Sequence, residues 1–375
     1  MPHISIYRFS RLTAAALAAA LVIGLSACAA GSPSASSQPA TNVSTIGSAA
    51  STQLPDPRKI QGQSTAESVP EVQPLAAHFT QQLPASVNDF EHRQVIVKDT
   101  SRILALDLYG TIADTVLAFG LGKNLIGRTV SNTNSSMAEL PVVTQNGHEL
   151  NAEAILQLKP SLVLVDSTIG PPEVLEQIRA SGVTVVSFNP DRSVALIAPG
   201  ITAIGQALGL TDAAVELNRQ VAAQLLETQE YIKTLSPAEE SRKPKIAFLY
   251  VRGKAGVFFI LGSGSGADDL IQQLGGIDVA AQAGVKDVKP ANSESLVALA
   301  PEVLLMMSSG LASTGGIEGL LKRPGVAETP AGAAHRVVEM ADGQILSFGP
   351  NFPAVLRSLA KAIYDPQGSV PTGKG

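Results

Sequence analysis

A tyrosine and an arginine stand two positions apart at the end of an apolar run, in the stretch AFLYVRG, Ala247 to Gly253. Residues two apart on a strand share a face, so the Tyr250 phenol and the Arg252 guanidinium are expected to lie together where the strand meets a loop. A free phenol has a pKa of about 10, and a fixed positive charge beside it favours the phenolate. The pair is therefore a candidate anionic oxygen ligand.

A histidine offers a second ligand of a different kind. His148 stands in TQNGHELN, and the fold expected below would place it across a cleft from Tyr250. Imidazole nitrogen and phenolate oxygen are both axial ligands of haem iron, and the hard phenolate suits ferric iron. Met306 and Met307 could add a thioether contact, Met307 ahead of Met306 because it aligns with a loop position. Taken singly, each residue has a simpler interpretation, as a tyrosine at the edge of the core, a surface-loop histidine or core methionines.

The elements that must position these residues form an internal repeat. NAEAILQLKPSLVLV, Asn151 to Val165, matches NSESLVALAPEVLLM, Asn292 to Met306, with an offset of 141 residues (294 − 153). Each copy begins with an Asn suited to cap a helix and a Glu in the first turn, and each ends in an apolar run typical of a buried parallel strand. RILALDLYG and KIAFLYVRG, 102–110 and 245–253, match in the same way. Two copies of one α/β unit are therefore predicted.

The fold class that follows is α/β, with two Rossmann-like lobes joined by one long helix and a ligand cleft between them. Residues 211–236 contain no Gly or Pro and predict that helix. Ligands of open α/β sheets bind at the carboxyl ends of strands, where Tyr250 and Met307 are expected. Their counterparts in the first copy are Asp107 and Asp166. Site positions thus differ between the copies while scaffold positions match, as a single asymmetric ligand would require.

The N-terminus has the features of an exported lipoprotein. A basic start precedes an apolar run, Leu12 to Leu25, that is too short for a comfortable membrane span. Leu25-Ser26-Ala27-Cys28 is typical of a bacterial lipobox, in which the cysteine is lipidated and becomes the mature N-terminus. An ordinary signal peptide with an incidental cysteine is the alternative. From Ala29 to about Lys98 the chain is rich in small and polar residues, which favours a flexible tether.

Composition and motifs exclude several function classes. The net charge of -5 over 375 residues gives no sign of nucleic-acid binding. No nucleophile–base pair or zinc motif is visible, so an enzyme is not predicted. The glycine-rich Leu261 to Asp269 lacks the Gly-Lys-Ser/Thr ending of a phosphate-binding loop and is interpreted as a flexible loop at the cleft. Glu153 and Glu294 are matched carboxylates, and they either stabilise their helices or dock to basic patches on a dimeric partner.

Taken together, these features resemble the substrate-binding lipoproteins of ABC importers, in the cluster with a helical backbone that binds cobalamin, siderophores or haem. The resemblance covers about Arg102 to Tyr364, and LPVVTQNGHELNAEAIL and FLYVRG are similar to haem-binding, HmuT-type members. It implies His148 and Tyr250 as axial ligands of the haem iron, Arg252 as a hydrogen-bond donor to Tyr250, and a contact from Met306 or Met307. It further implies that Glu153 and Glu294 dock to arginines of the permease.

The sequence thus predicts a monomeric, non-enzymatic receptor that captures ferric haem, haem b, outside the cell membrane. It would be anchored through lipid on Cys28 and deliver haem to a dimeric ABC permease with its ATPase. A ferric-siderophore or cobalamin receptor on the same fold, and a receptor for metal ions, are the alternatives. The expected parts are a signal peptide, a tether, an N-terminal lobe, the linker helix, a C-terminal lobe and a tail, at 1–27, 28–98, 99–210, 211–236, 237–366 and 367–375.

Overall fold

The chain folds into two α/β lobes, and each lobe is built on its own sheet. The computed structural model describes residues 54–253 and 257–366, so the predicted signal peptide, Cys28 and the tail lie outside the described residues. The N-lobe sheet is parallel, in the order β4-β7-β8, and its strands are almost wholly buried. The C-lobe sheet has seven strands, in the order β1-β14-β13-β9-β10-β12 with β11 beside β9.

Helices and hairpins complete the lobes. The N-lobe strands are β4 (Ile103–Leu106), β7 (Leu162–Asp166) and β8 (Thr184–Phe188), with the hairpin β5 (Thr144–Gln145) and β6 (Glu149–Leu150) and helices α1 (Thr111–Ala118), α2 (Ala152–Gln157), α3 (Pro172–Ala180) and α4 (Val194–Ala207). The C-lobe strands are β9 (Lys245–Arg252), β10 (Val257–Leu261), β11 (Ile277–Asp278), β12 (Val288–Pro290), β13 (Val303–Met307) and β14 (Val337–Met340). Its helices are α6 (Ala267–Gln273), α7 (Val279–Gln282), α8 (Ser293–Leu299), α9 (Ser308–Ser313), α10 (Ile317–Leu320), α11 (Pro330–Ala333), α12 (Asp342–Ile345) and α13 (Phe352–Tyr364).

The internal repeat is visible in matched local structure. Asn151 and Asn292 cap α2 and α8, each accepting a backbone N–H three residues on, from Ala154 at 3.0 Å and from Ser295 at 2.8 Å. The strands that follow, β7 and β13, begin 141 residues apart, at Leu162 and Val303. A side-chain cap fixes where each helix begins. The apolar run after each helix forms a strand that is buried inside a sheet.

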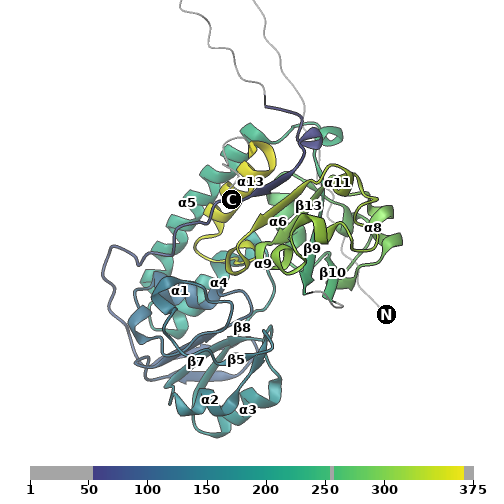
Figure 1. Cartoon of the computed structure of the whole chain (residues 1–375). Helices are drawn as coiled ribbons and strands as arrows, with labels where there is room; N and C mark the ends of the chain where they lie inside the picture. The colour runs from purple at the N-terminus through teal and green to yellow at the C-terminus, as the bar shows by residue number, and fades with distance from the viewer. Residues whose placement is uncertain (1–53, 254–256, 367–375) are drawn as a thin grey trace, which may run out of the picture. The chain divides into compact units, whose positions relative to one another are not determined.

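One long helix, α5 (Thr211–Leu235), links the lobes. It packs against α4 of the N-lobe and α13 of the C-lobe (Figure 1). Its buried face includes Leu217, Val221 and Ile232. The α/β fold of two lobes joined by a helix is therefore confirmed.

The segment before the N-lobe, residues 54–98, is called the strap here. Its first half belongs to the C-lobe: β1 (Gln63–Thr65) pairs in parallel with β14 at the edge of the sheet. Val69 exchanges two hydrogen bonds of 3.1 Å with the side-chain amide of Gln344. Lys361 forms an ion pair of 2.7 Å with Glu67.

The second half of the strap belongs to the N-lobe. The Leu75 amide donates to the Ala118 carbonyl of α1, and the hairpin of β2 (Ala85–Asn88) and β3 (Gln94–Val97) packs beside β8 and α4. The expectation of a flexible tether as far as residue 98 is therefore corrected from residue 54 onward. Backbone pairing fixes the segment, and three of its apolar side chains, Val69, Val72 and Val97, are buried.

Candidate functional site

Tyr250 and Arg252 lie on one face at the carboxyl end of β9. Tyr250 is half-buried and packs against the main apolar core, and the Arg252 guanidinium carbon lies 4.8 Å from the centroid of its ring. The neighbouring strand β13 runs parallel to β9, so both strands end at the same edge of the sheet. The structure thus brings together the phenol and the cation that the sequence paired.

The two methionines point to opposite faces of β13. Met306 is fully buried in a separate apolar cluster with Leu249 and Leu296. The Met307 sulfur instead lies 3.4 Å from Nη2 of Arg252. Successive side chains of a strand alternate between faces, and this register places Met307 beside Arg252 and buries Met306 in the core.

His148 lies on the N-lobe, in the turn of the β5–β6 hairpin. It is exposed, and its carbonyl accepts a hydrogen bond of 3.0 Å from the Gly170 amide. The turn contains Asn146 and Gly147 with φ of 50° and 89°, the left-handed backbone that these residue types tolerate best. Among the described residues, no hydrogen bond or ring contact joins His148 to Tyr250.

The N-lobe adds an arginine and a tyrosine that the sequence did not single out. The guanidinium carbon of Arg192 lies 3.7 Å from the centroid of the Tyr109 ring, and its Nη2 pairs with Asp166 at 3.3 Å. Burial raises the pKa of the Tyr109 phenol, and Tyr250 is close enough to contribute to that rise. The repeat aligns Tyr109 with Arg252, so the sequence could have indicated Tyr109 as a site position. Nothing in the sequence marks Arg192, which lies in the loop after β8.

Asp107 directly follows β4 and Asp166 is the last residue of the parallel neighbour β7, so both lie at one edge of the N-lobe sheet, as their counterparts Tyr250 and Met307 lie towards the ends of the parallel strands β9 and β13. Asp107 accepts backbone N–H groups of Gly110 and Ile112, and so holds the start of α1. Burial, and then the nearby Asp166 carboxylate, raise the pKa of Asp107 to about 7. Burial likewise raises the pKa of Asp166, although Arg192 opposes the rise.

These carboxyl groups should make the protein more stable in mild acid. A pKa that is higher in the folded state means that folded Asp107 keeps its proton where the unfolded chain has released it. The free energy of unfolding should therefore fall as pH rises from about 4 to about 7, by a few kcal/mol, because each tenfold change in proton affinity corresponds to about 1.4 kcal/mol. Asp114, whose pKa burial raises to about 6, acts in the same direction.

Urea unfolding between pH 4 and 8 measures this dependence. Asp107→Asn should flatten it, whereas Asp212→Asn, at the exposed start of α5, removes a charge without removing a buried carboxyl group. A wild-type stability that increases through this pH window would contradict the assignment.

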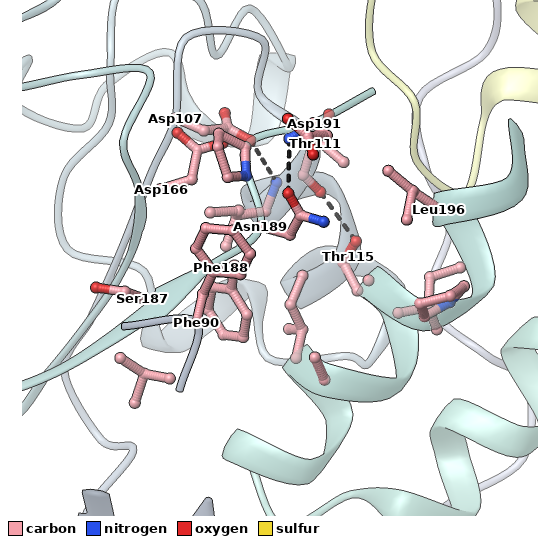
Figure 2. Close-up of a pocket in the computed structure, with 18 of the residues that line it drawn as sticks. Phe90, Asp107, Thr111, Thr115, Asp166, Ser187, Phe188, Asn189, Asp191 and Leu196 are labelled. Carbon is pink, nitrogen blue, oxygen red and sulfur yellow. Dashed lines mark hydrogen bonds between the residues drawn. The ribbon is translucent and has the colours of Figure 1, made fainter. Parts of the chain in front are cut away.

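A cavity of about 380 Å³ lies next to this N-lobe cluster. Figure 2 shows the carboxylates of Asp107 and Asp166 near one end and the rings of Phe188 and Phe90 beside it. Its walls come from β8, α4 and the β2–β3 hairpin, whereas Tyr250, Arg252 and His148 do not line it. This cavity and the predicted ligand residues are thus separate. The candidate ligand site is assigned from the chemistry of Tyr250 and Arg252 at the end of β9 and not from the cavity.

The glycine-rich loop at Leu261 to Asp269 is already filled by its own side chains. Asp268 accepts N–H groups of Gly264 and Gly266 at 3.0 and 3.2 Å, so a carboxylate occupies the place a phosphate would take. Asp269 accepts the Val194 amide at 2.7 Å and thereby joins the loop to the first turn of α4 in the other lobe. The loop, interpreted from its glycines as flexible, is an ordered contact between the lobes.

Glu153 and Glu294 occupy equivalent exposed positions in the first turns of α2 and α8. The Glu153 carboxylate accepts only a weak bond of 3.2 Å from Gln157, one turn along its own helix. Both carboxylates are accessible on the surface.

In the part of the chain that the structure describes, no helix is long and apolar enough to cross a membrane. No three His, Cys, Asp or Glu side chains within that part are grouped so that they could hold a metal ion.

Comparison with known proteins decides the family. The family described as periplasmic binding protein matches residues 107–342. The chain belongs to this family. This periplasmic binding protein resembles the uncharacterized ABC transporter substrate-binding lipoprotein YvrC of Bacillus subtilis (strain 168). The two are 25% identical over 77% of this chain and 88% of the relative.

Solved structures of this periplasmic binding protein's relatives agree in fold. The heme binding protein HmuT is 45% identical, with 83% of this chain and 100% of that chain covered and a TM-score of 0.80. RhuT from Roseiflexus sp. RS-1, a periplasmic heme-binding protein, is 34% identical over 72% and 99% of the chains, with a TM-score of 0.66. BhuT, solved with two hemes, is 30% identical over 70% and 98%, with a TM-score of 0.62.

Proposed function

We propose that this protein is an extracytoplasmic haem receptor that delivers ferric haem to an ABC importer. The observation that carries the proposal is the tyrosine–arginine pair at the end of β9, in a chain 45% identical to the heme binding protein HmuT. Structures of HmuT with single alanine replacements at a histidine, a tyrosine and an arginine also match, and that tyrosine and arginine are two positions apart, as Tyr250 and Arg252 are.

Each lobe supplies one iron ligand in this proposal. Tyr250 provides a phenolate oxygen from the C-lobe, and His148 an imidazole nitrogen from the N-lobe. Arg252 places a positive charge beside this ligand, since its guanidinium carbon lies 4.8 Å from the ring centroid. Of the two methionines, we propose Met307 as the haem contact, because its sulfur lies beside Arg252, whereas Met306 lies on the other face of β13 and is 0% exposed.

The ligands also differ in how firmly they are held. Tyr250 stands on a central strand between β13 and β10, and its ring packs on the core. His148 stands on an exposed hairpin turn, which can adjust when haem enters. We propose that haem first binds Tyr250 and that His148 then completes the coordination from the opposite lobe.

Titration of the soluble chain that follows Cys28 with hemin tests this function. The expected result is a saturable one-to-one change of the Soret band with a charge-transfer band of iron-bound phenolate. Ferric siderophores and cobalamin, tested in parallel by isothermal calorimetry, should show no comparable binding. Weak, unsaturable hemin adsorption together with tight binding of a siderophore or of cobalamin would overturn the haem assignment in favour of the other ligands of this fold.

We further propose that the protein is a monomer that is anchored by lipid on Cys28 and docks through Glu153 and Glu294 onto arginines of a dimeric permease. Two equivalent carboxylates, one on each lobe, suit a partner with two equivalent basic patches. The relative YvrC, itself named as a lipoprotein, supports the anchoring.

Replacing both glutamates by alanine should abolish delivery and leave haem capture intact. The affinity of the double variant for the permease in lipid nanodiscs should fall at least roughly tenfold, because each of the two substitutions leaves a permease arginine without its partner. Glu173→Ala with Glu318→Ala is the matched control, since these residues are also exposed carboxylates in the first turns of helices, one per lobe. Equal losses in the two double variants would mean that general charge, rather than these positions, governs docking.

A further inference from the structure

Arg252, which supports the proposed tyrosine ligand, is itself held by Asp342. Its Nη2 donates to Oδ1 of Asp342, forming an ion pair between side chains that are 33% and 25% exposed. The same nitrogen reaches the Met307 sulfur, and Nη1 donates to the Val251 carbonyl at 3.3 Å. Of the described residues that contact this guanidinium, Asp342 is the one that carries an opposite charge.

The Asp342 carboxylate is fixed from two sides. Asp342 is the first residue of α12 and follows β14 after one residue, and β14 is paired with β13 through Met340 and Met307. Its second oxygen, Oδ2, accepts the Ser309 amide at 2.9 Å, in the first turn of α9. The carboxylate therefore has little freedom to follow Arg252, so Arg252 must adopt the position that the carboxylate sets.

The opposite side of the guanidinium is closed by backbone. A Cβ atom at Gly310 would lie 3.0 Å from Nη1 of Arg252 and 2.8 Å from the Val251 carbonyl oxygen, so α9 approaches the arginine as closely as a glycine permits. Between this wall and Asp342, the guanidinium is kept 4.8 Å from the centroid of the Tyr250 ring. A free arginine side chain has many rotamers, and most of them would move its charge away from the ring.

We propose that Asp342 is a positioning residue for the iron ligand, which acts by holding Arg252 against Tyr250. The inference rests on the proposed function. Asp342 has two opposing effects on a phenolate, because its own negative charge disfavours the phenolate while the arginine that it orients favours it. The site is partly exposed, so solvent weakens the longer-range repulsion, and the placement of the nearer cation decides the sign.

Haem dissociation rates and resonance Raman spectra of the soluble chain that follows Cys28 test this role. Asp342→Ala should speed haem loss about tenfold, the effect of releasing one charge-assisted hydrogen bond, and shift the iron–phenolate band. Asp342→Asn can still accept the Ser309 amide with its single oxygen, and it should show the same direction with less loss of thermal stability. If both variants match wild type, or bind haem more tightly, the proposal is wrong.

A double-mutant cycle separates positioning from a general structural effect. In an Arg252→Ala background, Asp342→Ala should change haem dissociation by less than about twofold, because the arginine that it orients is gone. Fully additive effects would overturn the proposal. Asp278→Ala is the matched control: Asp278 caps α7 through two backbone amides in the same lobe, so its loss should lower the melting temperature and leave the Raman band unchanged.

Wild-type spectra separate failure of this inference from failure of the proposed function. If wild type shows no iron–phenolate band with hemin, both the function and this inference are rejected. If the band is present and is insensitive to Asp342, only the inference is rejected.

Discussion

Tyr250→Phe should remove the iron–phenolate charge-transfer band and weaken hemin binding by about a hundredfold or more, the loss expected when a metal–ligand bond is deleted. The substitution deletes one oxygen and keeps the ring that packs on the core. Arg252 can remain over the phenylalanine face, so the fold is expected to be unchanged. Hemin titration followed by absorbance measures both effects.

Tyr231→Phe is the matched control for this substitution. Tyr231 lies on α5, and the guanidinium carbon of Arg357 is 4.1 Å from its ring centroid, so the same oxygen is removed from a similar tyrosine–arginine pair. Its hemin titration should equal that of wild type. His148→Ala should weaken binding less, by about tenfold, because ordering the exposed turn offsets part of the gain from the bond. A Tyr250→Phe protein with the wild-type spectrum would exclude Tyr250 as a ligand.

The second large effect concerns stability and falls on Arg336. This side chain is 0% exposed and donates to Ser64 Oγ at 2.6 Å and to the Gly62 carbonyl at 3.3 Å. It also donates to the carbonyls of Ala362 and Ile363, at 2.8 and 2.9 Å, in the last turn of α13. Burial lowers its pKa to about 10, so it is still charged at pH 7 and meets the negative end of the α13 dipole.

Arg336→Met should lower the free energy of unfolding by about 3 kcal/mol or more, because it leaves buried acceptors in the strap and in α13 without a donor. Arg336→Lys keeps the charge but not the two-pronged geometry, and it should fall between Met and wild type. Guanidinium unfolding at pH 7 measures the difference.

The control for Arg336 is Arg357→Met. Arg357 pairs with Glu227 at 3.7 Å and its side chain is 48% exposed, so its loss should cost less than about 1 kcal/mol. If Arg336→Met and Arg357→Met lowered the free energy of unfolding equally, the buried hydrogen bonds of Arg336 would not stabilise the fold.

The sequence predicted best what local rules determine. Asn151 and Asn292 cap helices, and apolar runs after them form buried strands, because both features depend on neighbours within a few residues. Alternation along β13 even separates Met307 from Met306 once the strand register is known. The ligand roles of His148 and Tyr250 stay predictions, since no contact in the structure joins them.

What the sequence did not predict depends on partners that are distant in the chain. Arg252 and Asp342 are 90 residues apart, and nothing near either residue marks the pair. The strap was assigned to the tether because its composition is polar, yet its backbone pairs with the folded lobes, as β1 does with β14. Edge pairing of that kind leaves almost no compositional trace.

The strap also imposes an order on folding. Residues 62–70 bond to partners between 272 and 294 positions further along the chain, at 334–361. The segment synthesised early therefore cannot take its place until almost the whole chain exists, and closure of so long a loop is slow. Until then the β14 edge of the C-lobe sheet is uncovered and open to pairing with another chain. The pairing of β1 with β14 is thus one of the last steps of folding, and β1 then covers a sheet edge that would otherwise favour aggregation.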